Sequence, residues 1–245
     1  MKVFTYNEDA RILAAAKHLS DAEPRDVRVH LLPIPAREQA LLSPKALCEM
    51  KKGDLACGYE ICAHLIAEIA ARGARVLDMA TDEDFVQENA LLTAEATMGY
   101  LLSEPRAPRD RYIGIIGYGR IGSALCRMLL FFGARVCVFT ARPSLRASLG
   151  ALGIESRPVR YEAGETVDAA GLDLIIQTAP AHIFKKENAP SCPLWNLAAA
   201  QYIGEGVLAK TLSALPAKVF YESGALALTR SVLRAIRPED ERSIL

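Results

Sequence analysis

The residues with the clearest chemical pattern form one glycine-rich segment, Gly117-Tyr118-Gly119-Arg120-Ile121-Gly122. The apolar run Arg111–Ile116 precedes it, and a helical pattern, Ser123–Phe132, follows. In such a pattern the first glycine permits a tight turn, the second lets a pyrophosphate approach the backbone, and the third lets helix and strand pack closely. The helix start adds free N–H groups and a partial positive charge. The segment predicts a dinucleotide-binding turn, and the alternative is a glycine turn used only for packing.

The end of the next expected strand, Ala134–Phe139, indicates which dinucleotide would bind. An NAD site usually has Asp or Glu there, about 20 residues after the glycines, to bind the ribose 2′-OH. This chain instead continues with Thr140-Ala141-Arg142-Pro143-Ser144, which offers a cation and hydroxyls but no acid. These groups suit a 2′-phosphate. NADP is therefore predicted over NAD, and the alternative is a solvated Arg142 at a helix start.

Two further strand ends supply candidate site residues. The apolar run Leu172–Gln177 ends in Thr178-Ala179-Pro180, and a loop in that place lies at the cofactor crevice of such a sheet. Leu194–Leu197 is a further expected strand, in which Asn196 would face the nicotinamide end unless it only caps a turn. His182 follows Pro180 by two residues and is the one histidine to consider as an acid or base. An exposed loop histidine without a role is the alternative.

The elements that would position these residues alternate between strand and helix patterns along the chain. This alternation predicts an α/β protein, with a Rossmann-type doubly wound parallel sheet and a smaller flavodoxin-like α/β domain. Strands are expected at Lys2–Tyr6, Val27–Leu32, Asp54–Cys57, Ala74–Met79 and Lys218–Tyr221, and helices at Glu8–Leu19, Glu60–Ala71, Glu83 to about Leu102 and about Gly224–Arg237.

One segment, Ser103–Asp110, has the composition of a linker because it holds two prolines and four charges. We therefore expect an N-terminal α/β domain over residues 1–104 that ends in a long helix. A dinucleotide-binding domain would cover residues 105–230, and a C-terminal helix and tail would cover residues 231–245.

Composition excludes several classes of function. The 245 residues hold 29 Lys and Arg against 29 Asp and Glu, so nucleic acid or an anionic membrane is not the expected partner. The start of the chain is acidic where a signal peptide needs an apolar stretch, and no apolar run approaches the 20 or so residues of a bilayer span. Six cysteines without a Cys-x-x-Cys pair indicate free thiols in a reducing cytosol and no zinc site. We expect a cytoplasmic protein without a metal.

The chain resembles the dipicolinate synthase A-subunit family, which is related to the D-isomer-specific 2-hydroxyacid dehydrogenases. The resemblance covers most of residues 75–200, and the segment before the expected linker is its most specific part. The matching residues are Asn89-Ala90-Leu91-Leu92-Thr93-Ala94-Glu95, Gly117–Gly122, Gly133-Ala134-Arg135-Val136, Ala141-Arg142, Thr178-Ala179-Pro180 and Asn196-Leu197-Ala198.

The resemblance implies two α/β domains with a cleft between them, a reduced nicotinamide cofactor, and a dihydrodipicolinate-type dicarboxylate as the substrate. It implies a role in sporulation, a homo-oligomer and a flavoprotein-type second subunit. It also implies that the helix with Thr93 and Glu95 faces the cleft and that the C-terminal helix crosses back onto the first domain. Candidate catalytic residues are then Glu95, Thr93, Asn196 and His182, and a solvated helix charge is the alternative for Glu95.

Two segments depart from the family pattern. Residues Asn196–Gln201 replace a family Asp-Leu-Ala-Ser run followed by Pro-Gly-Gly, and Glu222–Thr229 replaces a Gly-Leu-Pro-Gly segment. The Arg, Glu and His set of the hydroxyacid dehydrogenases is not evident either. Three functions stay open: an NADP-dependent oxidoreductase, a non-catalytic dinucleotide-binding protein that senses or scaffolds, and an adenosylhomocysteinase-like nucleotide enzyme. The missing strand-end acid counts against the third.

Overall fold

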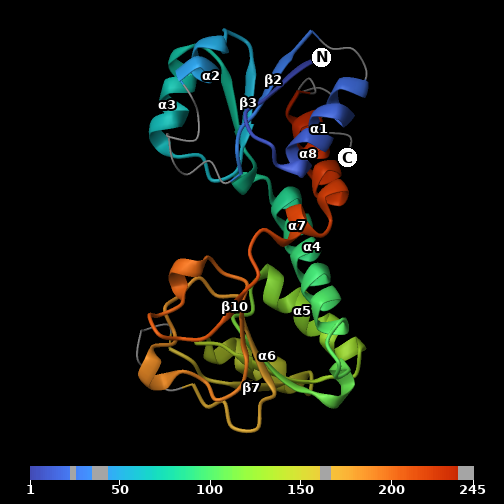
Figure 1. The fold of residues 1–245 in the computed structure, drawn as a ribbon, viewed down its shortest axis with the longest axis vertical. Helices are drawn as coiled ribbons and strands as arrows, with labels where there is room; N and C mark the ends of the chain where they lie inside the picture. Colours follow the sequence, from blue (N-terminus) through green and yellow to red (C-terminus); the bar gives the residue numbers. More distant parts are fainter. Residues whose placement is uncertain (23–25, 35–43, 161–166, 237–245) are drawn as a thin grey trace. The chain divides into compact units, whose positions relative to one another are not determined.

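The computed structural model describes residues 1–22, 26–34, 44–160 and 167–236. The chain forms two compact units (Figure 1). Unit 1 combines residues 1–92 with the segment from Pro216 onward, and unit 2 consists of residues 93–215. The end of the expected C-terminal helix, Arg237, and the tail after it lie outside the described residues.

Unit 1 is built on a parallel sheet of four strands in the order β1-β2-β3-β4. The strands are β1 (Lys2–Thr5), β2 (Arg28–Leu31), β3 (Leu55–Gly58) and β4 (Arg75–Asp78). This parallel α/β architecture agrees with the predicted fold class. Flavodoxin has the strand order 2-1-3-4-5, whereas the described strands of unit 1 follow the chain order. The order of these described strands contains no reversal. A reversal of strand order is the place where open α/β sheets usually bind ligands.

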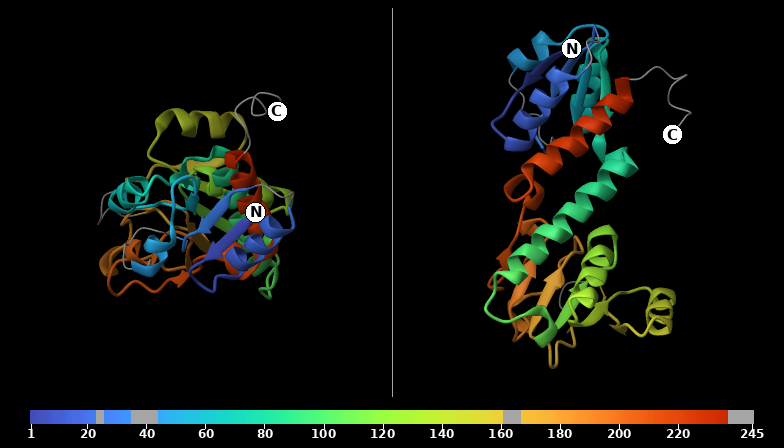
Figure 2. Two further views of the ribbon diagram at one scale, coloured as in Figure 1. Left: turned by 90° about the horizontal axis from the view of Figure 1, so that it is seen from above. Right: turned by 90° about the vertical axis from the view of Figure 1, so that its right-hand side faces the viewer.

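Helices cover both faces of this sheet. On one face α1 (Ala10–Asp21) lies beside α8 (Tyr221–Ile236), as the views of Figures 1 and 2 agree. Ile12 and Leu19 of α1 share an apolar core with Leu228 and Val232 of α8. On the other face α2 (Pro44–Glu49) and α3 (Ala63–Ala71) enclose a second core, to which Leu47, Leu65 and Ile69 belong. The C-terminal helix is thus an integral layer of unit 1.

Unit 2 contains a six-stranded parallel sheet in the order β10-β9-β8-β5-β6-β7. The strands are β5 (Tyr112–Ile116), β6 (Arg135–Phe139), β7 (Glu155–Arg157), β8 (Leu174–Gln177), β9 (Leu194–Asn196) and β10 (Lys210–Thr211). Counted within the unit from β7, the order is 3-2-1-4-5-6, which is the doubly wound order of dinucleotide-binding sheets. The reversal lies between β5 and β8. The Rossmann-type sheet predicted from the sequence is confirmed.

Two helices, α5 (Arg120–Phe131) and α6 (Pro143–Ala151), accompany the first three strands of unit 2. The apolar face of α5 buries Leu125 and Leu129, and Gly133 at φ +78° ends that helix region. Another core, which contains Phe139 and Ile175, is closed by Phe184 from the segment between β8 and β9. Short 3₁₀ turns complete the connections: η2 (Met79–Thr81), η3 (Pro108–Asp110), η4 (Lys186–Asn188) and η5 (Ala200–Tyr202).

The segment expected as a linker is folded into unit 2. Pro108 is buried, and Arg106 forms an ion pair with Asp173, 2.5 Å away, at the start of the β8 region. The boundary falls earlier, inside the long helix α4 (Glu83–Leu102), because the second half of that helix buries Ala94 and Leu101 in unit 2. The observed division therefore differs from the expected bounds 1–104, 105–230 and 231–245.

The expected strand at Lys218–Tyr221 is wrong. This segment holds the end of α7 (Leu215–Lys218) and the first residue of α8. Its aromatic and β-branched residues favour a strand, but the burial of α8 on α1 imposes a helix. The last strand of the second sheet is instead the two-residue β10, which is too short to give a pattern. None of the described helices combines the length and apolar character that crossing a membrane requires.

Candidate functional site

The glycine-rich turn lies at the reversal of strand order in unit 2. It follows the carboxyl end of β5, and Thr178 follows the carboxyl end of the neighbouring β8. The Thr178 hydroxyl donates a hydrogen bond to the Ile116 carbonyl at 3.0 Å. This bond fastens the two strand ends to each other, so the turn has a fixed position at the place where dinucleotides bind.

Gly117 and Gly122 are required by the backbone itself. Gly117 has φ +92°, and a Cβ there would lie 2.9 Å from the Thr178 hydroxyl oxygen. A Cβ on Gly122 would lie only 2.3 Å from the Gly117 carbonyl oxygen. The first glycine makes the turn, and the third lets α5 start directly beside it.

Gly119 is different because neither its backbone conformation nor a contact with the described residues requires a glycine. Its φ is −84°, which any residue can adopt, and a Cβ added there would meet no atom of the described residues within 4 Å. The residue is exposed and is the N-cap of α5, yet no side chain caps that helix. An uncapped helix start with open space before it suits an anion such as a pyrophosphate. The residues present thus fit the diphosphate of a dinucleotide.

The other residues of the turn line the same place. Arg120 is exposed at the helix start, and Ile121 is half-buried. Tyr118 is also half-buried, and burial together with the nearby Cys126 thiol raises the pKa of its phenol. Tyr118 therefore keeps its proton at neutral pH and can act as a hydrogen-bond donor.

The segment after β6 carries two exposed polar side chains and one enclosed hydroxyl. Thr140 is only 2 % exposed, and its hydroxyl accepts the backbone N–H of Arg142 at 3.3 Å. Arg142 is the N-cap of α6 without a side-chain cap, and the side chains of Arg142 and Ser144 are exposed, as is Ala141. Arg142 and Ser144 are therefore available to a ligand, whereas the Thr140 hydroxyl serves the turn.

Sequence reasoning missed Arg146, which returns to the same strand end. Its Nη1 donates to the Thr140 carbonyl oxygen at 2.9 Å. Long side chains on a helix point back toward its N-terminus, so an arginine one turn after Arg142 could have been considered from the spacing alone. No acid occurs between residues 140 and 154.

The Gln177 side chain, at the end of β8, fixes the loop that follows this strand through hydrogen bonds. This side chain is fully buried, and its Nε2 donates to the carbonyls of Ala179 and Ala181. Pro180 and His182 are exposed on the loop, and the His182 ring meets the edge of Tyr202 with centroids 5.5 Å apart. Tyr202, in η5 after β9, was not expected from the sequence. The structure thus brings His182 to the carboxyl side of the second half of the sheet.

Asn196 is fully buried and used inside its own turn. Its Nδ2 donates to the Ala199 carbonyl, and its Oδ1 accepts the Ala198 N–H at 3.1 Å. This is the turn-capping alternative considered from the sequence. Both polar atoms of the amide have partners within the turn, so the turn fixes the orientation of this side chain.

Thr93 and Glu95 are not brought together on one face of α4. Residues two positions apart on a helix are separated by about 200°. Thr93 is buried and Glu95 is exposed. A single ligand therefore cannot contact both side chains from the same side of this helix.

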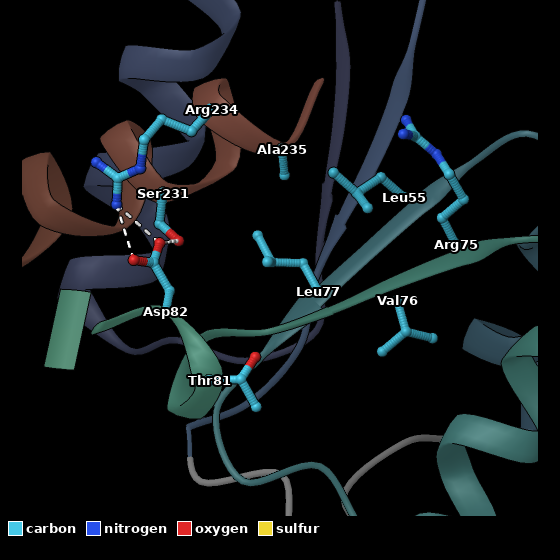
Figure 3. A pocket seen from close by; sticks show the side chains of 9 residues that line it. All are labelled: Leu55, Arg75, Val76, Leu77, Thr81, Asp82, Ser231, Arg234 and Ala235. Atoms are coloured by element: carbon cyan, nitrogen blue, oxygen red, sulfur yellow. Dashed lines mark hydrogen bonds and ion pairs between the residues drawn. The ribbon is translucent and has the colours of Figure 1, made fainter. Parts of the chain in front are cut away.

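Unit 1 contains a cavity of about 390 Å³ beside β4, shown in Figure 3. Asp82 accepts hydrogen bonds from Ser231 at 2.5 Å and from Arg234 at 2.7 Å, and it also caps α4 through the Phe85 N–H. Burial would raise the pKa of Asp82, but these hydrogen bonds outweigh it and lower that pKa. Because the polar groups satisfy one another, this cluster ties α8 to the start of α4.

A second polar group in unit 1 is the buried His30 of β2. Its Nδ1 lies 2.5 Å from the Tyr6 hydroxyl, and its Nε2 lies 2.9 Å from Oδ2 of Asp54. The ring is fully buried and stacks on Phe4. Burial lowers the pKa of His30 and raises that of Tyr6 to about 12. Both groups are thus neutral at physiological pH and link the ends of three strands.

Among the described residues, no group of His, Cys, Asp and Glu side chains is suited to hold a metal ion.

Comparison with known proteins supports the fold. No protein-family model and no curated protein sequence matches the chain. Among solved structures it is similar to the A subunit of dipicolinate synthase from Bacillus halodurans, with a TM-score of 0.77, 18% identity, and coverage of 97% of this chain and 98% of that chain. The chain is also similar to the A chain of dipicolinate synthase from Bacillus subtilis, with a TM-score of 0.75, 17% identity, and coverage of 96% of this chain and 96% of that chain.

D-lactate dehydrogenase from Escherichia coli is a more distant match, with a TM-score of 0.57, 14% identity, and coverage of 99% of this chain and 98% of that chain. The resemblance inferred from the residues is thus confirmed as a similarity of structure over nearly the whole chain. The chain has the α/β fold of the dipicolinate synthase A subunits, at low sequence identity.

Proposed function

We propose that the chain is an NADPH-dependent oxidoreductase that acts on a dicarboxylate of the dihydrodipicolinate type. One observation carries the proposal: the glycine turn at the strand-order reversal leaves open space at Gly119 before an uncapped helix start. The structural similarity to the A subunit of dipicolinate synthase over 97% of the chain supports the substrate class.

Each part of the cofactor has candidate residues in unit 2. Residues 117–122 and the N-terminus of α5 would hold the diphosphate. The end of β6 would hold the adenosine ribose, and the lack of an acid between residues 140 and 154 supports NADP over NAD. Residues 178–180 would lie beside the nicotinamide half. The bound cofactor would carry the hydride, while the protein supplies position and electrostatics.

His182 is the group we propose for proton transfer. It is exposed on the loop after β8, and its contact with Tyr202 limits the orientations of its ring. An imidazole has one ring nitrogen that can accept a proton and one that can donate it, which suits a residue that takes up and releases a proton. Loss of one limb of the pH–rate profile in His182→Gln would support this role, and an unchanged profile would contradict it.

The assembly state is also a proposal. Phe131 and Leu152, at or beside the ends of α5 and α6, are 87% and 73% exposed. Contiguous exposed apolar side chains mark interaction surfaces, and Leu130 and Phe132 beside Phe131 are also exposed. We propose that the chain forms a homo-oligomer and works in the cytoplasm with a flavoprotein-type second subunit. Light scattering on the purified chain tests the first point.

A second candidate function is dinucleotide binding without catalysis, as in a sensor or scaffold. Asn196 is satisfied inside its own turn, and Thr93 and Glu95 lie on different faces of α4. Three of the four candidate catalytic residues thus do not converge on one site, which favours binding without turnover.

Titration of the purified protein with NADPH and NADH, followed by a turnover assay, tests both candidates. We expect NADPH to bind more tightly than NADH. In the turnover assay with a cyclic dicarboxylate, we expect either reduction of NADP⁺ to NADPH or oxidation of NADPH. Binding without turnover, with or without a flavoprotein-type partner, would support the second candidate. A protein that binds neither nucleotide would contradict both.

A further inference from the structure

We propose that Arg146, rather than Arg142, is the main ligand of the cofactor's 2′-phosphate. The inference rests on the proposed function and names the residue that determines cofactor specificity within that site. It follows from the position, the hydrogen bonding and the charge surroundings of two arginines at one strand end.

The Arg146 guanidinium is anchored where the adenosine ribose would lie. Nη1 donates to the carbonyl oxygen of Thr140, the residue directly after β6, at 2.9 Å. Thr140 is 2 % exposed and its hydroxyl is engaged, so this carbonyl has a fixed position. The end of the second strand is the place from which dinucleotide-binding proteins contact the ribose 2′ substituent. Arg146 therefore presents its charge at that place.

The anchoring leaves Arg146 most of its donors. A guanidinium has five N–H groups in a rigid fork, and the bond to Thr140 uses one of them. The residue is half-exposed, and among the described residues its side chain makes no other hydrogen bond, so its remaining donors are left for a ligand. Because one edge is already fixed, binding a phosphate costs little further side-chain entropy.

Arg142 lacks this preorganisation. Its backbone N–H bonds to the Thr140 hydroxyl, but its side chain is exposed and makes no hydrogen bond to the described residues. A free arginine side chain loses rotamer entropy when a ligand immobilises it. Arg142 and Arg146 are four positions apart and so lie on one side of the helix start. Arg142 can approach the same phosphate, but at a higher entropic cost.

Within the described residues, no carboxylate neutralises either arginine. Neither forms an ion pair with a carboxylate in the described part of the chain, whereas Arg135 and Arg157 of the same sheet both pair with Glu155. A 2′-phosphate carries close to two negative charges and accepts bidentate hydrogen bonds from a guanidinium. The ribose of NADH offers no such charge, so this pair of cations discriminates between the two cofactors.

The test compares single charge removals in the full-length protein. In Arg146→Gln we expect the NADPH dissociation constant to rise about 10- to 100-fold, the range of lost charged hydrogen bonds, with NADH affinity unchanged. In Arg142→Gln we expect a rise of less than about 5-fold, as for a weakly held charge pair. Arg109→Gln, an exposed arginine in η3 before β5, is the matched control and should leave both affinities unchanged.

A second pair of ligands locates the effect on the phosphate. Arg146→Gln should weaken 2′,5′-ADP but not ADP, which lacks the 2′-phosphate. Equal weakening of NADPH and NADH would mean that Arg146 only supports the turn, and a larger loss in Arg142→Gln would assign the phosphate to Arg142. Either result would overturn the inference and leave the proposed function intact. If wild-type protein bound neither NADPH nor 2′,5′-ADP, the proposed function itself would fail.

Discussion

Gly119 and Gly122 belong to one turn, but an added methyl group should affect them in opposite ways. The Gly119→Ala methyl enters open space, so we expect the unfolding free energy to change by less than about 1 kcal/mol. The same methyl obstructs the approach of a diphosphate, so NADPH affinity should fall at least tenfold. Urea unfolding and a fluorescence titration measure the two effects.

Gly122→Ala should instead damage the fold, because its methyl would lie 2.3 Å from the Gly117 carbonyl oxygen. Overpacking of this kind costs about 1–3 kcal/mol or more. Gly99→Ala, which also adds a methyl to open space in unit 2, is the control and should leave NADPH binding unchanged. Full NADPH affinity in Gly119→Ala would show that the turn does not hold a diphosphate.

The sequence predicts a residue's role when that role depends only on residues close to it in the chain. Gly117 and Gly122 serve a backbone path of a few residues, and the motif specifies it. Arg146 and Tyr202 escaped prediction because their roles depend on where a side chain ends in space. Asn196 shows the opposite case: the same strand-end position fits either a ligand or its own turn, and only the hydrogen bonds distinguish them.

At the scale of the element, strand β2 places a titratable ring in the core of unit 1. Burial lowers the pKa of His30 below its ordinary 6.5, while Tyr6, Asp54, Arg28 and Glu49 face it from the neighbouring segments. Below pH about 6.5 the unfolded chain takes up a proton that the folded chain resists. The free energy of unfolding should therefore have its full value above that pH and should fall as the pH drops toward the folded-state pKa of His30.

Urea denaturation at a series of pH values between about 8 and 5 tests this dependence. The wild-type protein should lose stability over that interval, and His30→Gln should be less stable at pH 8 but show a flatter slope. His64→Gln removes a histidine whose side chain is 64% exposed, so it should keep the wild-type slope. A His30→Gln protein with an undiminished slope would assign the pH dependence to other groups.

Element types followed from local patterns where burial was also local. The helical stripe of α1 and the strands β5 and β6 were expected within one or two residues of their bounds. Lys218–Tyr221 has strand-forming residues, yet α8 begins there because Leu228 and Val232 need a helix to reach α1. Ser103–Asp110 has linker composition, yet Arg106 and Pro108 bind it into unit 2. Contacts between residues distant in sequence therefore override the local propensity for helix, strand or loop in these segments.

At the scale of the whole molecule, the chain leaves unit 1, builds unit 2, and returns to complete unit 1 with α8. Unit 2 is one continuous segment, residues 93–215, whereas the core of unit 1 joins residues from both ends of the chain. Periodicity reveals a C-terminal helix but not the sheet on which it packs, so this discontinuity could not be derived from the residues alone. We therefore expect core mutations in α8 to reduce the stability of unit 1 and to leave the binding site proposed in unit 2 intact.

Leu228→Ala tests this separation. Leu228 is 1% exposed in the α1–α8 core, and removing its side chain should destabilise unit 1 by about 2–5 kcal/mol. NADPH affinity should stay at the wild-type value at a temperature where the variant is folded, because all proposed ligands of the cofactor lie in unit 2. Leu226→Ala on the same helix is the control, since Leu226 is 42% exposed and its loss should be close to neutral.

Calorimetry would then show which unit binds the ligand. A ligand present at 100 times its dissociation constant stabilises the state that binds it by about 2.7 kcal/mol. If the two units unfold in separate steps, Leu228→Ala should lower one transition and NADPH should raise the other. A ligand shift confined to the transition that Leu228→Ala lowers would place the nucleotide in unit 1 and contradict the assignment of the glycine turn. A single transition that both changes move would show that the units unfold together, and the unchanged NADPH affinity of Leu228→Ala would then be the deciding measurement.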